Sequence, residues 1–189
     1  MKGNMKDILK TTLILTLICV IVAVGLALTN SLTSEKIAAQ NEKAENEAMS
    51  RVLPGDMYNE KTATVSGKEY SYREVIKNGE TAGYIFTVAN NGYGGPVKVM
   101  TGVDIEGNVT AIEVISAPDE TPGLGQKVTN TSFWEQFKGK SGEISVSRTE
   151  AGKDEVLAIT GATISTKSVV ASVNEALKIF DTVAIKEAE

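Results

Sequence analysis

One uninterrupted apolar segment constrains the structure of this chain more than any other feature. Residues 11–29 read TTLILTLICVIVAVGLALT and carry no charge. At about 1.5 Å per residue, a helix of this length covers roughly 29 Å, enough for the hydrocarbon core of a membrane. The segment is longer than the apolar region of a signal peptide, and no clear cleavage site of small residues ends it. We therefore expect a transmembrane helix over residues 11–30.

The charges that flank this segment predict its orientation. Three lysines precede it, and an acidic and a basic residue follow it together: Lys2, Lys6, Lys10, Glu35 and Lys36. By the positive-inside rule, residues 1–10 lie in the cytoplasm and the rest of the chain lies on the outer side of the cell membrane.

Two further parts are expected beyond the membrane segment. Residues 31–54 contain many strong helix formers and predict a helical stalk, with Thr33 or Ser34 as the candidate N-cap and a Pro-Gly pair as the stop. Residues 55–189 are long enough for one domain of ordinary size.

Composition excludes several classes of chemistry. The chain contains no histidine, which removes Ser-His-Asp triads, most zinc sites and His-ligated haem. Its single cysteine, Cys19, cannot form an internal disulfide or hold an iron–sulfur cluster, so we expect no metal site. The net charge is −5 and no cluster of Lys or Arg is present, so we expect no nucleic-acid binding. Redox chemistry would need an imported cofactor.

Apolar spacing predicts an α+β fold for residues 55–189. Strand-like segments cover 62–65, 70–75, 83–89, 96–105, 109–115 and 143–147. Turn signals at 77–79 and 106–108 favour antiparallel pairing of these strands. A short helix is expected over 131–138, and a longer helix with one apolar face is expected from Ser165 onward. The expected architecture is a mainly antiparallel sheet with a C-terminal helix.

Two segments rich in glycine and polar residues could hold a ligand. The first covers 90–96 and contains Tyr93, Gly94 and Gly95, which offer an aromatic ring and close backbone approach. The second covers 119–125 and offers backbone N–H groups around a Pro-Gly turn. Its candidate residues are Glu120, Thr121, Gly123, Leu124 and Gly125. On composition alone, an ordinary connection explains the first segment equally well, and an ordinary turn is the better interpretation of the second.

A third segment, 158–166, joins a strand-like run to the last helix. A helix N-terminus offers unpaired N–H groups and the positive end of the helix dipole, which stabilise a phosphate without Lys or Arg. Small and hydroxyl-bearing residues gather there: Thr160, Gly161, Ala162, Thr163, Ser165 and Thr166. Ordinary N-capping by Thr163 or Ser165 would require only one hydroxyl.

In this order, the motifs resemble a known family. The residues TGAT at 160–163, followed by IS, resemble the motif of FMN-binding domains in which a flavin transferase esterifies the FMN phosphate to the last threonine. The residues ETPGLG at 120–125, GYGGP at 92–96, FWEQF at 133–137 and the single N-terminal anchor extend the resemblance over essentially the whole chain. It looks most like the G subunit of the Rnf electron transport complex, and is more distantly similar to the C subunit of the sodium-pumping NADH:quinone reductase. Leu157 stands where this family often has an aspartate.

The resemblance implies a cofactor and its contacts. FMN would be joined to Thr163 by a phosphoester, with its ring between the 93–95 and 120–125 loops. Further contacts are implied from the hydroxyls of Thr121 and Thr160 and the N–H groups of Gly161 and Ala162.

The resemblance also implies partners. The chain would relay electrons among other Rnf-type membrane and redox subunits, as an electron carrier and not as a complete catalyst. The assembled complex would couple ferredoxin and NAD redox chemistry to Na⁺ or H⁺ transport. Two alternatives stay open: a stand-alone flavinylated carrier on the outer side of the membrane, and an anchored binding domain without redox chemistry.

Overall fold

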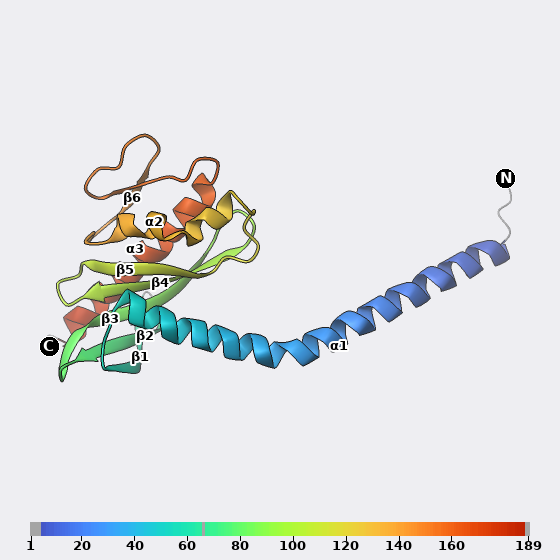
Figure 1. Ribbon diagram of the computed structural model, residues 1–189, viewed down its shortest axis with the longest axis horizontal. Helices are drawn as coiled ribbons and strands as arrows, with labels where there is room; N and C mark the ends of the chain where they lie inside the picture. Colours follow the sequence, from blue (N-terminus) through green and yellow to red (C-terminus); the bar gives the residue numbers. More distant parts are fainter. Residues whose placement is uncertain (1–4, 66, 188–189) are drawn as a thin grey trace. The chain divides into compact units, whose positions relative to one another are not determined.

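A computed structural model describes residues 5–65 and 67–187 (Figure 1). Lys2 of the expected cytoplasmic N-terminus and the last two residues of the expected domain lie outside the described residues. The chain divides into two compact units, Met1–Ala44 and Glu45–Glu189. The first unit is helical wherever it is described, and the second contains the sheet.

Helix α1 (Met5–Val52) contains the apolar segment. Residues 7–34 of this helix are long and apolar enough to cross a membrane, and none of their most apolar stretch is buried inside the protein. The prediction that a separate stalk helix begins at Thr33 or Ser34 is wrong, because α1 continues through both residues. Their hydroxyls donate to carbonyls of the preceding turn, as hydroxyls inside a helix do, and so do not cap a new helix.

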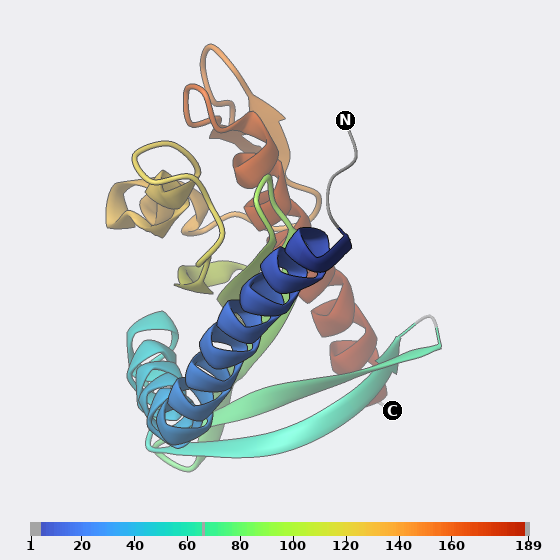
Figure 2. The same ribbon diagram turned by 90° about the vertical axis from the view of Figure 1, so that its right-hand side faces the viewer.

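Five antiparallel strands form the main sheet in the order β1-β2-β3-β4-β5. Their bounds are β1 (Met57–Val65), β2 (Lys68–Lys77), β3 (Glu80–Asn91), β4 (Pro96–Asp104) and β5 (Val109–Ser116). Strands β1 and β2 form a long curved hairpin (Figure 2). Both predicted turns form, and Gly79 and Gly107 adopt positive φ in them. The predicted antiparallel sheet is therefore confirmed.

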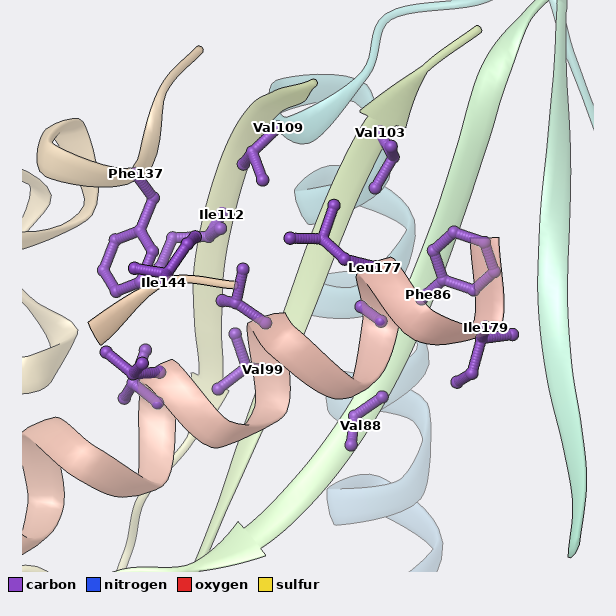
Figure 3. Close-up of a cluster of buried hydrophobic side chains, with 14 of the residues drawn as sticks. Phe86, Val88, Val99, Val103, Val109, Ile112, Phe137, Ile144, Leu177 and Ile179 are labelled. Carbon is purple, nitrogen blue, oxygen red and sulfur yellow. The ribbon is translucent and has the colours of Figure 1, made fainter. Parts of the chain in front are cut away.

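Each face of the sheet has its own hydrophobic core. Helix α3 (Thr163–Glu187) crosses one face, where Phe86 and Leu177 belong to the larger cluster (Figure 3). On the other face, Ile85 packs in a smaller cluster with Met49 and Val52 from the end of α1. Neighbouring residues of a strand point to opposite faces, so Ile85 and Phe86 lie in different cores.

Short elements connect β5 to α3. They are η1 (Gly125–Thr129), α2 (Thr131–Trp134), η2 (Glu135–Phe137), β6 (Ser145–Ser147) and β7 (Glu155–Leu157). The predicted short helix over 131–138 thus forms as α2 and η2, and its Phe133 and Phe137 are buried in edge-to-face contact. Strands β6 and β7 pair in parallel as a separate sheet. The predicted strand over 143–147 therefore exists as β6 but does not extend the main sheet.

Candidate functional site

The third glycine-rich segment ends in the first turn of α3. The helix begins at Thr163, earlier than the Ser165 start expected from the apolar spacing. A tight turn precedes it, in which Ala162 N–H donates to the Ile159 carbonyl at 2.9 Å and Gly161 adopts a φ of 79°. This left-handed conformation favours glycine, so the backbone geometry of the turn explains why position 161 is a glycine. Thr163 is consequently placed at the N-terminal end of the helix dipole.

The hydroxyls of this segment divide into two groups. Thr166 accepts a hydrogen bond from Ile159 N–H and donates to the Ala162 carbonyl, and Ser165 donates to Glu120. Thr160 and Thr163 make no hydrogen bond through their hydroxyls with the part of the chain that the structure describes. Two of the four hydroxyls are therefore engaged in holding the fold, and two are available to a ligand.

A buried carboxylate connects the three segments. Glu120 is 2% exposed. Its Oε1 accepts a hydrogen bond from Tyr93 N–H at 2.7 Å, and its Oε2 accepts one from the Ser165 hydroxyl at 2.7 Å. The loop after β3, the loop after β5 and the first turn of α3 thus meet at one side chain.

The glycines of the 92–95 loop pack against the 119–120 segment on the side where a Cβ would stand. A Cβ on Gly92 would lie 2.0 Å from Glu120 Oε1, and a Cβ on Gly94 would lie 1.8 Å from the carbonyl oxygen of Asp119. A Cβ on Gly95 would lie 2.7 Å from an Asp119 carboxylate oxygen. None of the three adopts positive φ. The 119–120 segment thus occupies the Cβ side of these glycines. The expectation that Gly94 and Gly95 bring backbone close to a ligand stays a prediction.

These segments enclose an open cavity of 530 Å³. Its volume lies within the range of small-molecule sites. The lining residues are Tyr93, Glu120, Thr121, Leu124, Gly125, Gly161, Ala162, Thr163, Ile164 and Ser165. Three of them form an apolar rim, with Tyr93 72%, Leu124 45% and Ile164 53% exposed. No Lys or Arg lines this cavity, so helix N–H groups and hydroxyls are the groups available to an anion.

The cavity includes most, but not all, of the residues expected from the sequence. Tyr93, Thr121, Leu124, Gly161 and Thr163 line it together with the other residues named above. The lining does not include Gly94, Gly95, Gly123 and Thr160.

Two details differ from the sequence interpretation. Ala162 N–H already donates to the Ile159 carbonyl, so it is not the free donor expected for a phosphate. The N–H groups of Thr163, Ile164 and Ser165 are the available donors instead, because they lie in the first helical turn, where no intrahelical acceptor exists. Ile164 directly follows the TGAT motif, but the sequence interpretation gives it no contact with a ligand; its exposure at the cavity rim is visible only in the folded chain.

A polar cluster joins the end of β3, just before the 92–95 loop, to the middle of α3. Asn90 donates to Glu175 Oε2 at 3.1 Å and to Ser172 at 3.2 Å, and Tyr70 donates to Glu175 Oε1 at 2.6 Å. Partial burial is the largest single influence on the pKa of Glu175, and by itself it raises this pKa. The hydrogen bonds from Tyr70 and Asn90, with the charge of Lys68, outweigh it, so the pKa of Glu175 is lowered overall.

Known proteins share this sequence over most of its length. Family models match residues 92–178 as an FMN-binding domain and residues 1–52 as the RnfG N-terminal region. The chain is 35% identical over 175 residues to the G subunit of the Na(+)-translocating ferredoxin:NAD(+) oxidoreductase complex of Acetobacterium woodii, a match that covers 81% of this chain and 82% of that relative. It is 33% identical over 148 residues to the G subunit of the proton-translocating ferredoxin:NAD(+) oxidoreductase complex of Clostridium ljungdahlii, covering 78% of this chain and 77% of that relative.

A solved structure shares the fold. The crystal structure of the C subunit of Na(+)-translocating NADH-quinone reductase from Parabacteroides distasonis aligns with a TM-score of 0.59 and 20% sequence identity. The alignment covers 77% of this chain and 96% of that chain.

Proposed function

The chain belongs to the family of the Rnf complex G subunit, and from this premise we propose that it is a membrane-anchored flavoprotein that relays electrons within an ion-translocating ferredoxin:NAD oxidoreductase complex. Other Rnf-type subunits are its partners, because its relatives are named as subunits of such complexes. Family membership favours this function over the stand-alone carrier, and the FMN-binding domain disfavours a module without redox chemistry.

One observation supports the position of the cofactor most directly. All residues that line the 530 Å³ cavity, from Tyr93 to Ser165, lie within the 92–178 match to the FMN-binding domain. The groups present fit FMN: an apolar and aromatic rim suits the flavin ring, and the N-terminus of α3 suits its phosphate. Bound FMN would supply the hydride and electron chemistry, while the protein supplies orientation, burial and electrostatics.

We place the covalent attachment at Thr163. Its side chain lines the cavity in the first turn of α3, and its hydroxyl has no acceptor or donor among the described residues. Ser165 and Thr166 are less suitable because their hydroxyls hold Glu120 and the 159–162 turn, and Thr160 does not line the cavity.

Threonine is a weak nucleophile, so attachment needs an activating partner. We propose a flavin transferase that uses FAD: a bond forms between Thr163 Oγ1 and the FMN phosphorus, the pyrophosphate bond of FAD breaks, and AMP leaves with the hydroxyl proton taken up by base. Thr163 is partly exposed at a cavity mouth, as such an enzyme would require.

We also place the flavin domain outside the cytoplasm. Lys6 and Lys10 precede the apolar segment of α1, so the positive-inside rule keeps residues 1–10 in the cytoplasm. Covalent attachment suits this side of the cell membrane, where dissociated FMN would be lost.

The attachment is tested by intact mass of the full chain co-produced with a flavin transferase. We expect a gain equal to FMN minus water in the wild type and in Thr160→Val, and no gain in Thr163→Val. Fluorescence of the denatured chain in a gel checks that the gain is a flavin. A Thr163→Val chain that still carries denaturant-resistant flavin would contradict the assignment.

A further inference from the structure

The attachment chemistry does not use Glu120, yet this carboxylate is almost completely buried in the site. Burial of a carboxylate is costly unless its oxygens accept hydrogen bonds. Both oxygens do so here, and both donors belong to the protein: Tyr93 N–H and the Ser165 hydroxyl. The side chain therefore has its hydrogen-bond partners before any ligand arrives.

We propose that Glu120 is a positioning residue that assembles the flavin site in the chain without ligand. Its carboxylate joins the 92–95 loop to the first turn of α3, and this fixes Tyr93 and Thr163 on the same cavity. The inference rests on the proposed function for the identity of the ligand. Its structural part concerns only the ligand-free chain.

The packing around the carboxylate supports this role. A Cβ on Gly92 would lie 2.0 Å from Oε1, and a Cβ on Gly125 would lie 1.9 Å from Oε2. The carboxylate thus fills the space that side chains at these two positions would occupy. This contact explains two of the glycines in the GYGGP and ETPGLG motifs as partners of Glu120.

The first turn of α3 provides a further reason for an acidic residue. Ser165 lies in this turn, so the carboxylate that accepts its hydroxyl is close to the positive end of the helix dipole. No Lys or Arg lines the cavity to compensate the charge of Glu120. The helix N-terminus and the two hydrogen bonds therefore stabilise it.

Removal of the carboxylate should release the 92–95 loop locally. Hydrogen bonds to a charged acceptor correspond to roughly 10- to 100-fold in the population of an opened state. We expect Glu120→Ala to speed hydrogen exchange of the Tyr93 amide by about this factor in the full chain made without flavin transferase. Amides of the buried middle of α3, such as that of Val173, should keep their exchange rates, because their helix and core are unchanged.

Ser165→Ala tests the two hydrogen bonds of Glu120 separately. It removes the bond to α3 but leaves Tyr93 N–H bonded to Oε1, so Tyr93 protection should persist while flavin loading slows. Glu150→Gln is the matched control: it removes an exposed negative charge outside the three segments of the site, and both Tyr93 exchange and loading should stay at wild-type values.

Two measurements on the same variants decide the proposal: amide exchange of the ligand-free chain, and the rate of mass gain with a flavin transferase and FAD. The proposal is supported if Glu120→Ala exposes the Tyr93 amide and slows loading while Val173 is unchanged. Unchanged Tyr93 exchange in Glu120→Ala would overturn it, and so would a uniform rise across α3, which indicates a role in global stability. Thr163→Val makes the two proposals distinguishable, because it should abolish loading without any change in Tyr93 exchange.

Discussion

Gly125 illustrates how a single residue of the site is determined by its neighbours. A Cβ at this position would lie 1.9 Å from Glu120 Oε2 and 3.0 Å from Ser165 Oγ. Its conformation is not left-handed, so the requirement for glycine comes from space alone. Gly161 is the opposite case, since its φ of 79° is unfavourable for any side chain.

At this scale we predict that Gly125→Ala destabilises the domain. Overpacking of this kind costs about 1–3 kcal/mol, which corresponds to a fall in Tm of roughly 3 to 10 °C for a chain of this size. Thermal unfolding followed by circular dichroism measures it. The control is Gly152→Ala, at an exposed glycine. The atom nearest to the added Cβ is there a carboxylate oxygen of Glu155, at 3.1 Å. Equal Tm values for the two variants would argue against the contact with Glu120.

Among the elements, α3 does most to organise the domain. One end of this helix forms the site, and its buried side packs across the sheet. Glu175, midway along it, accepts hydrogen bonds from Tyr70 on β2 and Asn90 on β3. The same helix therefore holds the base of the 92–95 loop and presents Thr163 to the cavity.

We predict that this contact weakens in acid. The pKa of Glu175 is lower in the folded chain than its ordinary value, so its contribution to stability is present above that ordinary value and is lost as the pH falls through the lowered pKa. Glu175→Gln should cost about 1 kcal/mol at neutral pH, and this difference should shrink below roughly pH 4. The measurement is Tm against pH for both chains. Asp181→Asn, at an exposed carboxylate of the same helix, should show no such convergence.

The whole molecule divides where the sequence showed no boundary. The expected stalk covered residues 31–54, but the compact unit begins at Glu45. Ala48, Met49, Val52 and Leu53 are buried against the sheet. The end of α1 is thus part of the domain core, which explains why the apolar residues Met49 and Leu53 follow a mostly polar stretch of the chain.

This division predicts how truncated chains behave. A chain that begins at Glu45 should fold cooperatively, since it keeps both cores. A chain that begins at Asp56 loses four buried side chains and exposes Ile85 and Met100, which should cost on the order of 4 kcal/mol or more. Urea unfolding of the two chains gives the difference. Equal stability would show that the end of α1 does not contribute to the domain.

Local patterns in the sequence determined much of this protein. The charge-free run predicts the apolar helix, the spacing of apolar residues and turns predicts the antiparallel sheet and α3, and the motif order predicts the FMN-binding family. All of these are confirmed. They are predictable because helix length, strand alternation and turn conformation depend on residues close together in the chain. The attachment of FMN at Thr163 stays a prediction.

Tertiary structure alone decided what each site residue contacts. The sequence contains four hydroxyls near the start of α3 but does not show which are engaged, because Ser165 is bonded to Glu120 from a loop 45 positions away. For the same reason the sequence does not show that the glycines of the 92–95 loop pack on the 119–120 segment. Nor does it show whether Met49 and Leu53, in the expected stalk over residues 31–54, pack on the domain or on another subunit; in the folded chain they belong to the smaller core. Such contacts join segments that are far apart in sequence, so the register of their packing exists only in the folded chain.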